Sequence, residues 1–412
     1  MQIKAFERKK YTAVPPGANG YYLKISDRIG HIKWICVILL VVTVAASVIF
    51  ARDEMSLHNF TYLVKHFDVN SADNAENFSV LRYDSNGSYN FGFYKDDLVI
   101  VSSTSVEYYD MKGNPVLSKN HSISNPRLVS TDGYLYVYDQ GGYSYSVYDS
   151  FFNLKNEVCD YPISKIAASD SGVFAVVTKD INYRSAVYIY DKSFKLLSSV
   201  LKDKIVIDVS LARDGSRVLI LSCETDLKGN YYTELMSVRP GQSEPEFTVT
   251  LDDVSPLYCG FFSDGSAFAV LSDSIVSFDR DGEKKGTAAF PSQFVTAVDM
   301  YDNSAALSFN DSVIGSRTTV YTYSSDCTVT GSYPLDGAVR RMKCDGGYIF
   351  AMLNDSIARI SMADGDTRTE QTDSNPLDFI IRSERALLVC YGNRTQAYDN
   401  IFPVKEEISD DN

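Results

Sequence analysis

Acidic residues recur through this chain at a spacing that could carry chemistry. Eight of them follow half-apolar segments at intervals of 36 to 50 residues. If the segments are equivalent, the carboxylates ring one face of the molecule, where they could bind calcium or contact a substrate. Asp-Gly pairs and the run Ser263 to Ser266 are, however, typical of hairpin turns, because glycine and aspartate accept a positive φ. We therefore interpret the set as turn residues: Asp96, Asp132, Asp170, Asp214, Asp264, Asp302, Asp345 and Glu384.

Histidine and cysteine give little material for catalysis or metal binding. Of the four histidines, only His121 lies in the repetitive part of the chain, so no catalytic triad or histidine metal site can be built there. The seven cysteines include no C-x-x-C pair, which excludes the usual zinc and redox motifs. Most lie in apolar segments, where cysteine behaves as a small buried hydrophobe, although the six beyond Cys36 would permit disulfides. We expect no cofactor, no metal and no enzymatic activity.

Tyrosines and basic residues in lengthened loops are the candidate binding residues. Residues 178–186, 222–233 and 308–318 are longer than the equivalent connections elsewhere. Loops that grow on a constant scaffold are where recognition tends to reside, and Tyr and Arg are enriched at interface hot spots. The alternative is that the tyrosines merely begin their strands and pack against the next unit. With one residue from the neighbouring loop 139–144, the candidates are Tyr143, Tyr183, Arg184, Lys228, Tyr231, Tyr232 and Arg317.

A repeat of about 40 residues must position these side chains. Each unit has a half-apolar strand, an Asp/Gly turn, a strongly apolar strand, a polar loop, an alternating strand and a more polar strand. Residues 127–149 show the first three of these strands. Eight copies of four short strands are the pattern of propeller blades. We predict an all-β fold, a seven- or eight-bladed β-propeller, with the number depending on whether Phe78 to Tyr83 completes the last unit.

The second strand of each unit supports this architecture. Residues 173–177, 218–221 and 348–352 are apolar on both faces, as expected of strands packed between two neighbouring blades. Two β-sandwiches are the alternative fold, but they would not need eight equivalent units. In a blade, the loop between the second and third strands opens on the face opposite the Asp/Gly turns. The candidate binding residues should therefore share one face.

The N-terminal residues form a different kind of segment. Residues 34–51 carry no charge, and as a helix they would span about 27 Å, close to a hydrocarbon thickness of roughly 30 Å. A cleaved signal peptide is the alternative, but a leader of 33 residues precedes the run and no clean cleavage site follows it. We predict a cytoplasmic basic tail (1–33), a transmembrane helix (34–51), a juxtamembrane neck (52–80) and an extracytoplasmic β-propeller (81–408).

Charge sets the expected orientation and excludes some partners. Residues 1–33 hold seven basic and two acidic residues, and positive flanks stay on the cytoplasmic side of a membrane. We expect a cell-membrane protein with a cytoplasmic N-terminus and an extracytoplasmic C-terminal domain. Of the 39 basic and 53 acidic residues in the chain, 32 and 51 lie beyond residue 33. This excess of negative charge would repel nucleic acid and anionic lipid headgroups.

The third strands end in an aromatic residue followed by aspartate, as at Tyr148-Asp149 and Phe278-Asp279. WD-repeat propellers carry Trp-Asp there and quinone-cofactor dehydrogenases carry a docking tryptophan in each blade, whereas the one tryptophan of this chain is Trp34. The basic tail, single anchor and acidic, tyrosine-rich repeats resemble an uncharacterised, domain-of-unknown-function family of single-pass membrane propellers from clostridia and other Gram-positive bacteria. The strand ends also resemble the quinoprotein-like repeats of envelope scaffolds. The resemblance covers nearly the whole chain and implies no functional residues.

The sequence favours a non-enzymatic scaffold, a membrane-tethered propeller that displays its loops to an envelope protein or cell-wall component. One alternative is a hydrolase or lyase that acts on an exported polysaccharide through carboxylates in the central funnel, although no carboxylate pair stands out. Another is a sensor that passes an outside signal to the N-terminal tail, which would need a cytoplasmic partner.

Overall fold

The computed structural model describes residues 32–42, 79–84, 89–149, 152–242, 244–291, 295–311 and 316–402. The chain divides into two compact units, Met1–Ser71 and Ala72–Asn412. In the first unit, residues 32–42 form a helix. Within the described part of the chain, no helix is both long enough and apolar enough to cross a membrane. Residues 43–51 of the expected span, the tail up to residue 31 and the neck from 52 to 78 lie outside the described residues.

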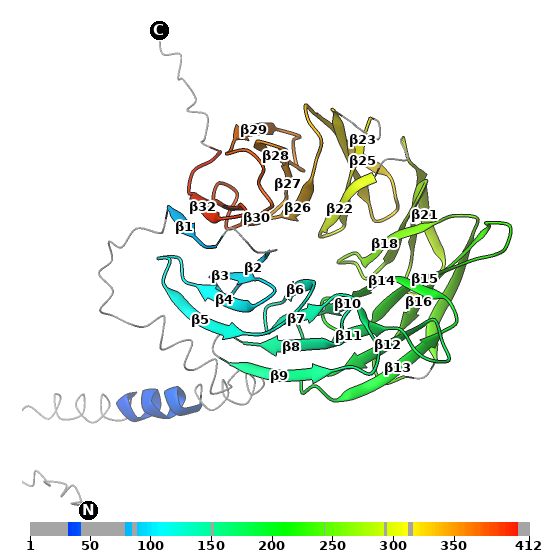
Figure 1. The fold of residues 1–412 in the computed structure, drawn as a ribbon, viewed down its shortest axis with the longest axis horizontal. Coiled ribbons are helices and arrows are strands. Elements are labelled where there is room, and N and C mark those ends of the chain that lie inside the picture. Colours follow the sequence, from blue (N-terminus) through cyan, green and yellow to red (C-terminus); the bar gives the residue numbers. More distant parts are fainter. Residues whose placement is uncertain are drawn as a thin grey trace, which may run out of the picture. The chain divides into compact units, whose positions relative to one another are not determined.

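The second unit is an eight-bladed β-propeller (Figure 1). Its described residues form 32 strands in eight antiparallel sheets of four, and each sheet runs from an inner to an outer strand. The predicted all-β propeller is confirmed. The sequence left seven or eight blades open, and the structure has eight. Blades one to four comprise β2 (Asn90–Tyr94), β3 (Asp97–Val101), β4 (Ser105–Tyr109) and β5 (Pro115–Asn120); β6 (Pro126–Ser130), β7 (Leu135–Asp139), β8 (Ser144–Tyr148) and β9 (Asn153–Val158); β10 (Ile163–Ala168), β11 (Phe174–Thr178), β12 (Ser185–Tyr190) and β13 (Leu196–Lys202); and β14 (Ile205–Leu211), β15 (Val218–Thr225), β16 (Tyr231–Val238) and β17 (Pro245–Asp252).

The second half of the ring repeats this order. Blades five to eight comprise β18 (Pro256–Phe261), β19 (Ala267–Leu271), β20 (Ser274–Phe278) and β21 (Lys284–Ala289); β22 (Val295–Tyr301), β23 (Ser304–Asn310), β24 (Thr318–Ser324) and β25 (Val329–Leu335); β26 (Arg341–Asp345), β27 (Tyr348–Met352), β28 (Ser356–Ser361) and β29 (Thr367–Gln371); and β30 (Asp378–Ile381), β31 (Leu387–Cys390), β32 (Arg394–Tyr398) and β1 (Val80–Arg82).

The ring closes by exchange between the two ends of the propeller. β1 is the outer strand of blade eight, where Val80 lies opposite Gln396 and Arg82 opposite Arg394 in antiparallel register. Residues 80–82 of the segment 78–83 thus complete the last unit, a possibility that the sequence left open. The first strand of the propeller therefore belongs to its last blade. If β1 detaches, the edge of β32 loses its hydrogen-bonding partner, and the reverse also holds.

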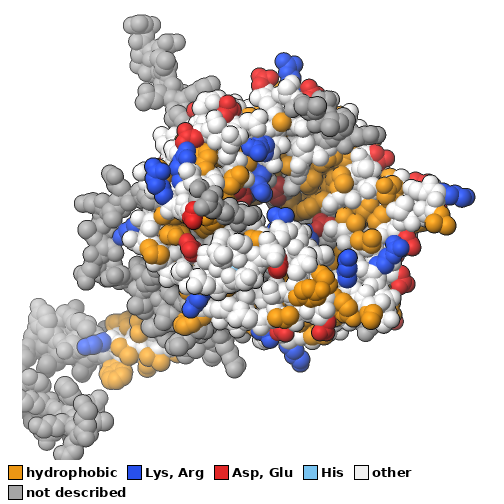
Figure 2. All heavy atoms as spheres, in the orientation of Figure 1, with side chains coloured by type: hydrophobic (Ala, Val, Ile, Leu, Met, Phe, Trp, Pro, Cys, Tyr) orange, Lys and Arg blue, Asp and Glu red, His pale blue; other side chains and the backbone are white. Residues whose placement is uncertain are grey.

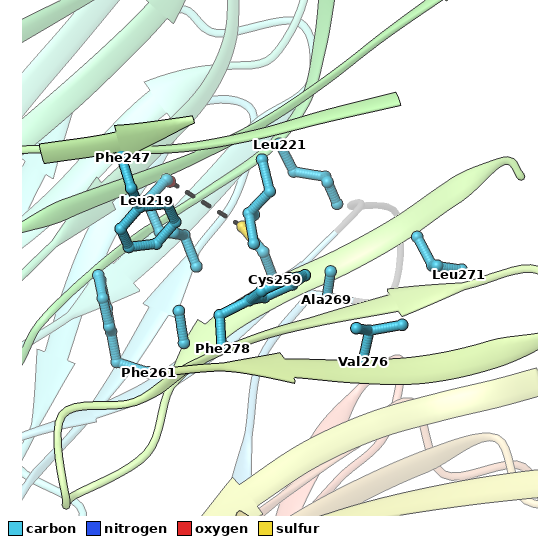
Figure 3. Close-up of a cluster of buried hydrophobic side chains, with 11 residues drawn as sticks. Leu219, Leu221, Phe247, Cys259, Phe261, Ala269, Leu271, Val276 and Phe278 are labelled. Atoms are coloured by element: carbon cyan, nitrogen blue, oxygen red, sulfur yellow. Dashed lines mark hydrogen bonds between the residues drawn. The ribbon is translucent and has the colours of Figure 1, made fainter. Parts of the chain in front are cut away.

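The core lies between the blades. In the described residues, eight clusters of buried side chains each join two neighbouring blades, so the packing continues around the ring. In one of them, Leu219 and Phe247 from blade four face Cys259, Phe261 and Phe278 from blade five (Figure 3). Second strands such as β3, β11 and β19 are buried at every position. Their apolar character on both faces follows from packing against two blades.

The recurring acidic residues lie in the turns between the first and second strands, except Asp345, which is the last residue of β26 just before its turn. In the two-residue turn after β2, Lys95 and Asp96 have φ angles of 46° and 66°, as a type I′ hairpin requires. In the turns of blades four and five, Asp214 and Asp264 accept the backbone N–H of the serine two positions on, at 2.9 and 2.8 Å. The interpretation as turn chemistry is confirmed. We call this side of the ring the turn face; the opposite side, with the loops between second and third strands, is the loop face.

Candidate binding face

The seven predicted binding residues all lie on the loop face. Each belongs to a connection between a second and a third strand, or to the first residues of that third strand. Residues 222–225 and 231–233 are strand and not loop, because β15 and β16 pair as far as Thr225 and Tyr231. The positions are Tyr143 before β8, Tyr183 and Arg184 before β12, Lys228 between β15 and β16, Tyr231 and Tyr232 at the start of β16, and Arg317 before β24.

The four tyrosines of this set are not core residues. Tyr143, just before β8, is 50% exposed, whereas Tyr145 within that strand is 2% exposed and packs against the next blade. Tyr183, Tyr231 and Tyr232 are also exposed. Tyr231 and Tyr232 do begin a third strand, as the alternative interpretation required, but they leave much of their surface open to solvent. These side chains are therefore available to a partner.

Six of the seven residues belong to three consecutive blades, and Arg317 does not. Blades two, three and four carry Tyr143, the pair at 183 and 184, and the residues around β16. Arg317 stands on blade six, where its Nε lies 3.7 Å from a carboxylate oxygen of Asp336 and both side chains are exposed. Exposed ion pairs of this kind contribute little to stability. The candidate face is thus centred on blades two to four.

The structure adds aliphatic side chains to this face. Ile181 is 77% exposed and Leu227 is fully exposed. Their signal in the sequence is a single aliphatic residue inside a polar loop, as in Asp180-Ile181-Asn182 and Asp226-Leu227-Lys228. We call the exposed apolar residues at the loop-face ends of blades two to five the loop-face set: Tyr143, Val158, Ile181, Tyr183, Leu201, Ile205, Leu227, Tyr231, Tyr232 and Leu257.

Hydrogen bonds within the turn between β15 and β16 define the conformation of the hairpin tip. The carboxylate of Asp226 accepts the backbone N–H groups of Lys228 and Asn230, at 2.8 and 2.9 Å, and Gly229 takes a φ of 88°. The hydrogen bond from Asn230 is the main reason that the pKa of Asp226 lies below its usual value. Such a turn holds Leu227 outward without support from the core. A binding residue on a fixed turn loses less conformational freedom when it meets a partner.

Carboxylates at the centre of the ring are engaged in holding blades together. Asp208 on β14 pairs with Lys165 on β10 and accepts the backbone N–H of Cys259 at 2.9 Å. Asp299 on β22 accepts the backbone N–H of Cys344 at 2.7 Å, and burial raises the pKa of this carboxyl group. In the described residues, no group of three His, Cys, Asp or Glu side chains could hold a metal ion.

No single charge sign dominates the face shown in Figure 2. Lysine and arginine side chains alternate there with aspartate and glutamate, and hydrophobic side chains gather on the right of the view, over the blades coloured green to yellow in Figure 1. A mixed surface of this kind suits contact with a protein better than contact with a polyanion.

Solved structures with the same architecture share the fold at low sequence identity. Sqt1 from Saccharomyces cerevisiae is 11% identical with a TM-score of 0.58, covering 79% of this chain and 99% of its own. BamB from Moraxella catarrhalis is 13% identical with a TM-score of 0.55, covering 78% and 99%. Apo AztD from Citrobacter koseri is 11% identical with a TM-score of 0.51, covering 73% and 94%. No curated protein matches the chain. Residues 71–398 match the sequence model of a family of unknown function, DUF5711, and the chain belongs to that uncharacterised family.

Proposed function

We propose that this protein is a non-enzymatic binding scaffold, anchored in the cell membrane by one helix, whose propeller lies outside the cytoplasm and binds an envelope protein or cell-wall component. The uncharged run 34–51 and the basic residues before it support the anchor and its orientation. The propeller supports the binding role, since its rigid blades carry loops that can vary without disturbing the core.

The observation that carries the binding role is the uneven distribution of exposed apolar side chains. The ten residues of the loop-face set lie on four consecutive blades, and in the described residues Leu377 on blade eight is the further exposed apolar side chain of this face. On the turn face of the described residues, the large exposed apolar side chains are fewer and dispersed: Val80, Phe152, Leu196, Leu197, Tyr301 and Val329.

Aliphatic and tyrosine side chains among charged neighbours are typical of a protein interface, where a small apolar centre is surrounded by a polar rim. Ile181 and Leu227 favour a protein over a polysaccharide, because a hydrated sugar chain offers little aliphatic surface to bury against them. An envelope protein is therefore the first partner to seek.

The carboxylates at the centre support a scaffold over a hydrolase. A retaining or inverting glycosidase needs two carboxyl groups free to face a sugar. Asp208 is buried and holds two neighbouring blades, and Asp299 accepts a backbone N–H from the next blade. Removing either group from these contacts would leave a buried N–H without a partner.

Partner capture with matched variants tests the binding role. Tagged full-length protein is crosslinked in its host, solubilised in mild detergent and purified. The loop-face variant Ile181→Ser/Leu227→Ser should lose a partner that the wild type captures in stoichiometric amount. The turn-face control Leu196→Ser/Val329→Ser removes apolar side chains of similar size and should retain it. Capture that survives in the loop-face variant but is lost in the control would assign binding to the other face.

Protease protection tests the orientation. In cells stripped of wall, added protease should digest the propeller, while a tag placed before Lys4 survives. The reverse pattern would contradict the extracytoplasmic location.

A further inference from the structure

A cavity of about 1370 Å³ opens on the turn face. It extends from the first turns of blades three to seven, between Asp170 and Asp345, into the groove between blades four and five. Three arginines line that groove: Arg217, Arg239 and Arg280. None of them belongs to the loop-face set, and the cavity lies on the opposite side of the ring.

Arg217 is a buried cation with an unused donor. It precedes β15, is 8% exposed, and stacks its guanidinium carbon 4.7 Å from the centre of the Phe261 ring. Its Nη2 donates to the carbonyl oxygen of Gly265 in the neighbouring blade. Its Nη1 is buried and has no hydrogen-bond partner in the described residues. A structural role in joining the blades explains the stacking and the bond from Nη2, but leaves the donor at Nη1 unexplained.

Arg280 approaches the same point from blade five. A Cβ at residue 265 would lie 2.8 Å from both Nε and Nη2 of Arg280 and 3.1 Å from Nη2 of Arg217. The two guanidinium groups therefore face each other across Gly265, which takes a φ of +83°. Arg280 donates one hydrogen bond, from Nη2 to the carbonyl oxygen of Asp264 at 3.0 Å, and is otherwise exposed to the cavity. Two cations in such proximity repel each other unless an anion lies between them.

Charged groups of both signs surround Arg217. Burial lowers the pKa of Arg217, the carboxylates of Glu246 and Asp214 raise it, and Arg280 and Arg239 lower it. The cavity as a whole is also lined by six carboxylates, those of Asp170, Asp214, Glu246, Asp281, Asp302 and Asp345, and Glu246 is paired with Arg239. At the groove, however, Arg217, Arg239 and Arg280 lie together, and Nη1 of Arg217 has no acceptor in the described residues. An anionic ligand would complement the groove.

We propose that the groove between blades four and five binds an oxyanion, a carboxylate or phosphate group of a ligand in the turn-face cavity, through Arg217, Arg239 and Arg280. Planar guanidinium groups suit both kinds of anion, because two N–H groups can donate to two oxygens at once. The oxyanion supplies the acceptor that Nη1 of Arg217 lacks. Arg280 and Arg239 supply exposed donors at the entrance.

Thermal unfolding of the full-length chain tests this site. Inorganic phosphate and a tri-aspartate peptide are compared with sodium chloride at equal ionic strength. At least one of the two probes should raise the Tm by about 2 °C or more, and the probe that does so distinguishes phosphate from carboxylate. Because Arg280 is exposed, Arg280→Gln should fold normally and weaken binding by roughly tenfold or more.

Arg213→Gln is the matched control. Arg213 lines the same cavity and is exposed, but it is paired with Asp170 at 2.7 Å, away from the groove. It should retain the effect of the anion. The proposal is overturned if neither probe raises the Tm, if the rise survives both Arg280→Gln and Arg239→Gln, or if Arg213→Gln abolishes it equally. In those cases Arg217 only joins two blades, and any bound anion is adventitious.

Discussion

The hydroxyl of Tyr83 donates a hydrogen bond of 2.7 Å to the carbonyl oxygen of Tyr391, across 308 positions of sequence. Tyr83 follows β1, and Tyr391 follows β31, so the bond joins the two ends of the propeller within its last blade. Burial is the main reason that the pKa of Tyr83 lies far above its usual value. The hydroxyl therefore keeps its proton, and its role as donor, throughout the physiological pH range.

Replacing Tyr83 by phenylalanine should weaken the closure of the ring. The change removes the donor and leaves the carbonyl oxygen of Tyr391 part-buried without it, which should cost about 1 kcal/mol of folding stability. Denaturant unfolding of the full-length chain measures the loss. Tyr89→Phe is the control, since in the described residues the hydroxyl of Tyr89 bonds only to the nearby carbonyl oxygen of Asp84. Equal stability of the two variants would show that the long-range bond contributes nothing.

The closing strand could be named as a candidate from the sequence, whereas the contacts between blades could not be predicted. The segment 78–83 has the apolar pattern of a strand, but the sequence left open whether it belongs to the last blade, and the pairing of β1 with β32 answers that question. Arg217 is an example of a contact between blades that the sequence did not predict. Its position next to an Asp-Gly-Ser turn indicates an exposed residue. It is buried because it packs against Phe261 and bonds to Gly265 of the next blade. A local sequence pattern cannot predict such packing between repeats.

The loops were predicted in the right places, but with incorrect ends. Residues 222–225 and 231–233 extend β15 and β16, since Thr225, Tyr231 and Tyr232 favour strand conformation once a partner strand is available. The exposed Ile181 and Leu227 were missed for a different reason. Periodicity identifies apolar residues that face a core, and it says nothing of a single apolar residue held outward by a turn.

Removing the carboxylate of Asp208 should destabilise the centre of the ring. Asp208→Ala leaves the buried N–H of Cys259 without its acceptor, which should cost about 1 to 3 kcal/mol. Asp208→Asn keeps an acceptor oxygen in place and should cost less. Denaturant midpoints of the two variants measure the difference. If Asp208→Asn is as damaging as Asp208→Ala, the charge pair with Lys165 matters more than the bond to the backbone.

The cysteines of the propeller should be unreactive while it is folded. The cysteines in the described residues are free, and burial raises the pKa of Cys159 to about 11 and that of Cys390 to about 12. Thiolates are the reactive form, so iodoacetamide should label a folded Cys36→Ser chain slowly at about pH 8.5 and label it fully in urea. Fast labelling of the folded chain would show that the blades open readily.

The raised pKa of a buried thiol predicts that the folded state loses stability at high pH. A free thiol has a pKa of about 8.5 when unfolded. Because the folded pKa of Cys390 is higher, the folded state keeps a proton that the unfolded state releases. The contribution of this group is fully present below about pH 8.5 and is lost as the pH rises toward 12. Cys390→Ala should therefore show a shallower loss of stability than the wild type over that range.

Simultaneous replacement of Tyr183, Arg184 and Tyr231 by alanine should abolish partner capture with little effect on folding. All three side chains are exposed on blades three and four, so the Tm should remain within about 2 °C of the wild type. Truncating a single hot-spot residue can cost about 2 kcal/mol or more, which corresponds to a roughly thirtyfold loss of affinity. Leu196, Leu197 and Val329, replaced together by alanine, form the control on the turn face.

The two readouts of this experiment separate binding from packing. If the tyrosines contact only a partner, capture falls while the Tm is unchanged, because no buried neighbour loses a contact. If they pack against the next blade, the Tm falls by several degrees, and capture falls only as far as folding does. Ile181→Ser/Leu227→Ser then gives an independent check, because it changes the same face without touching a tyrosine. Unchanged capture by both loop-face variants, with normal Tm values, would show that the partner binds elsewhere on the propeller.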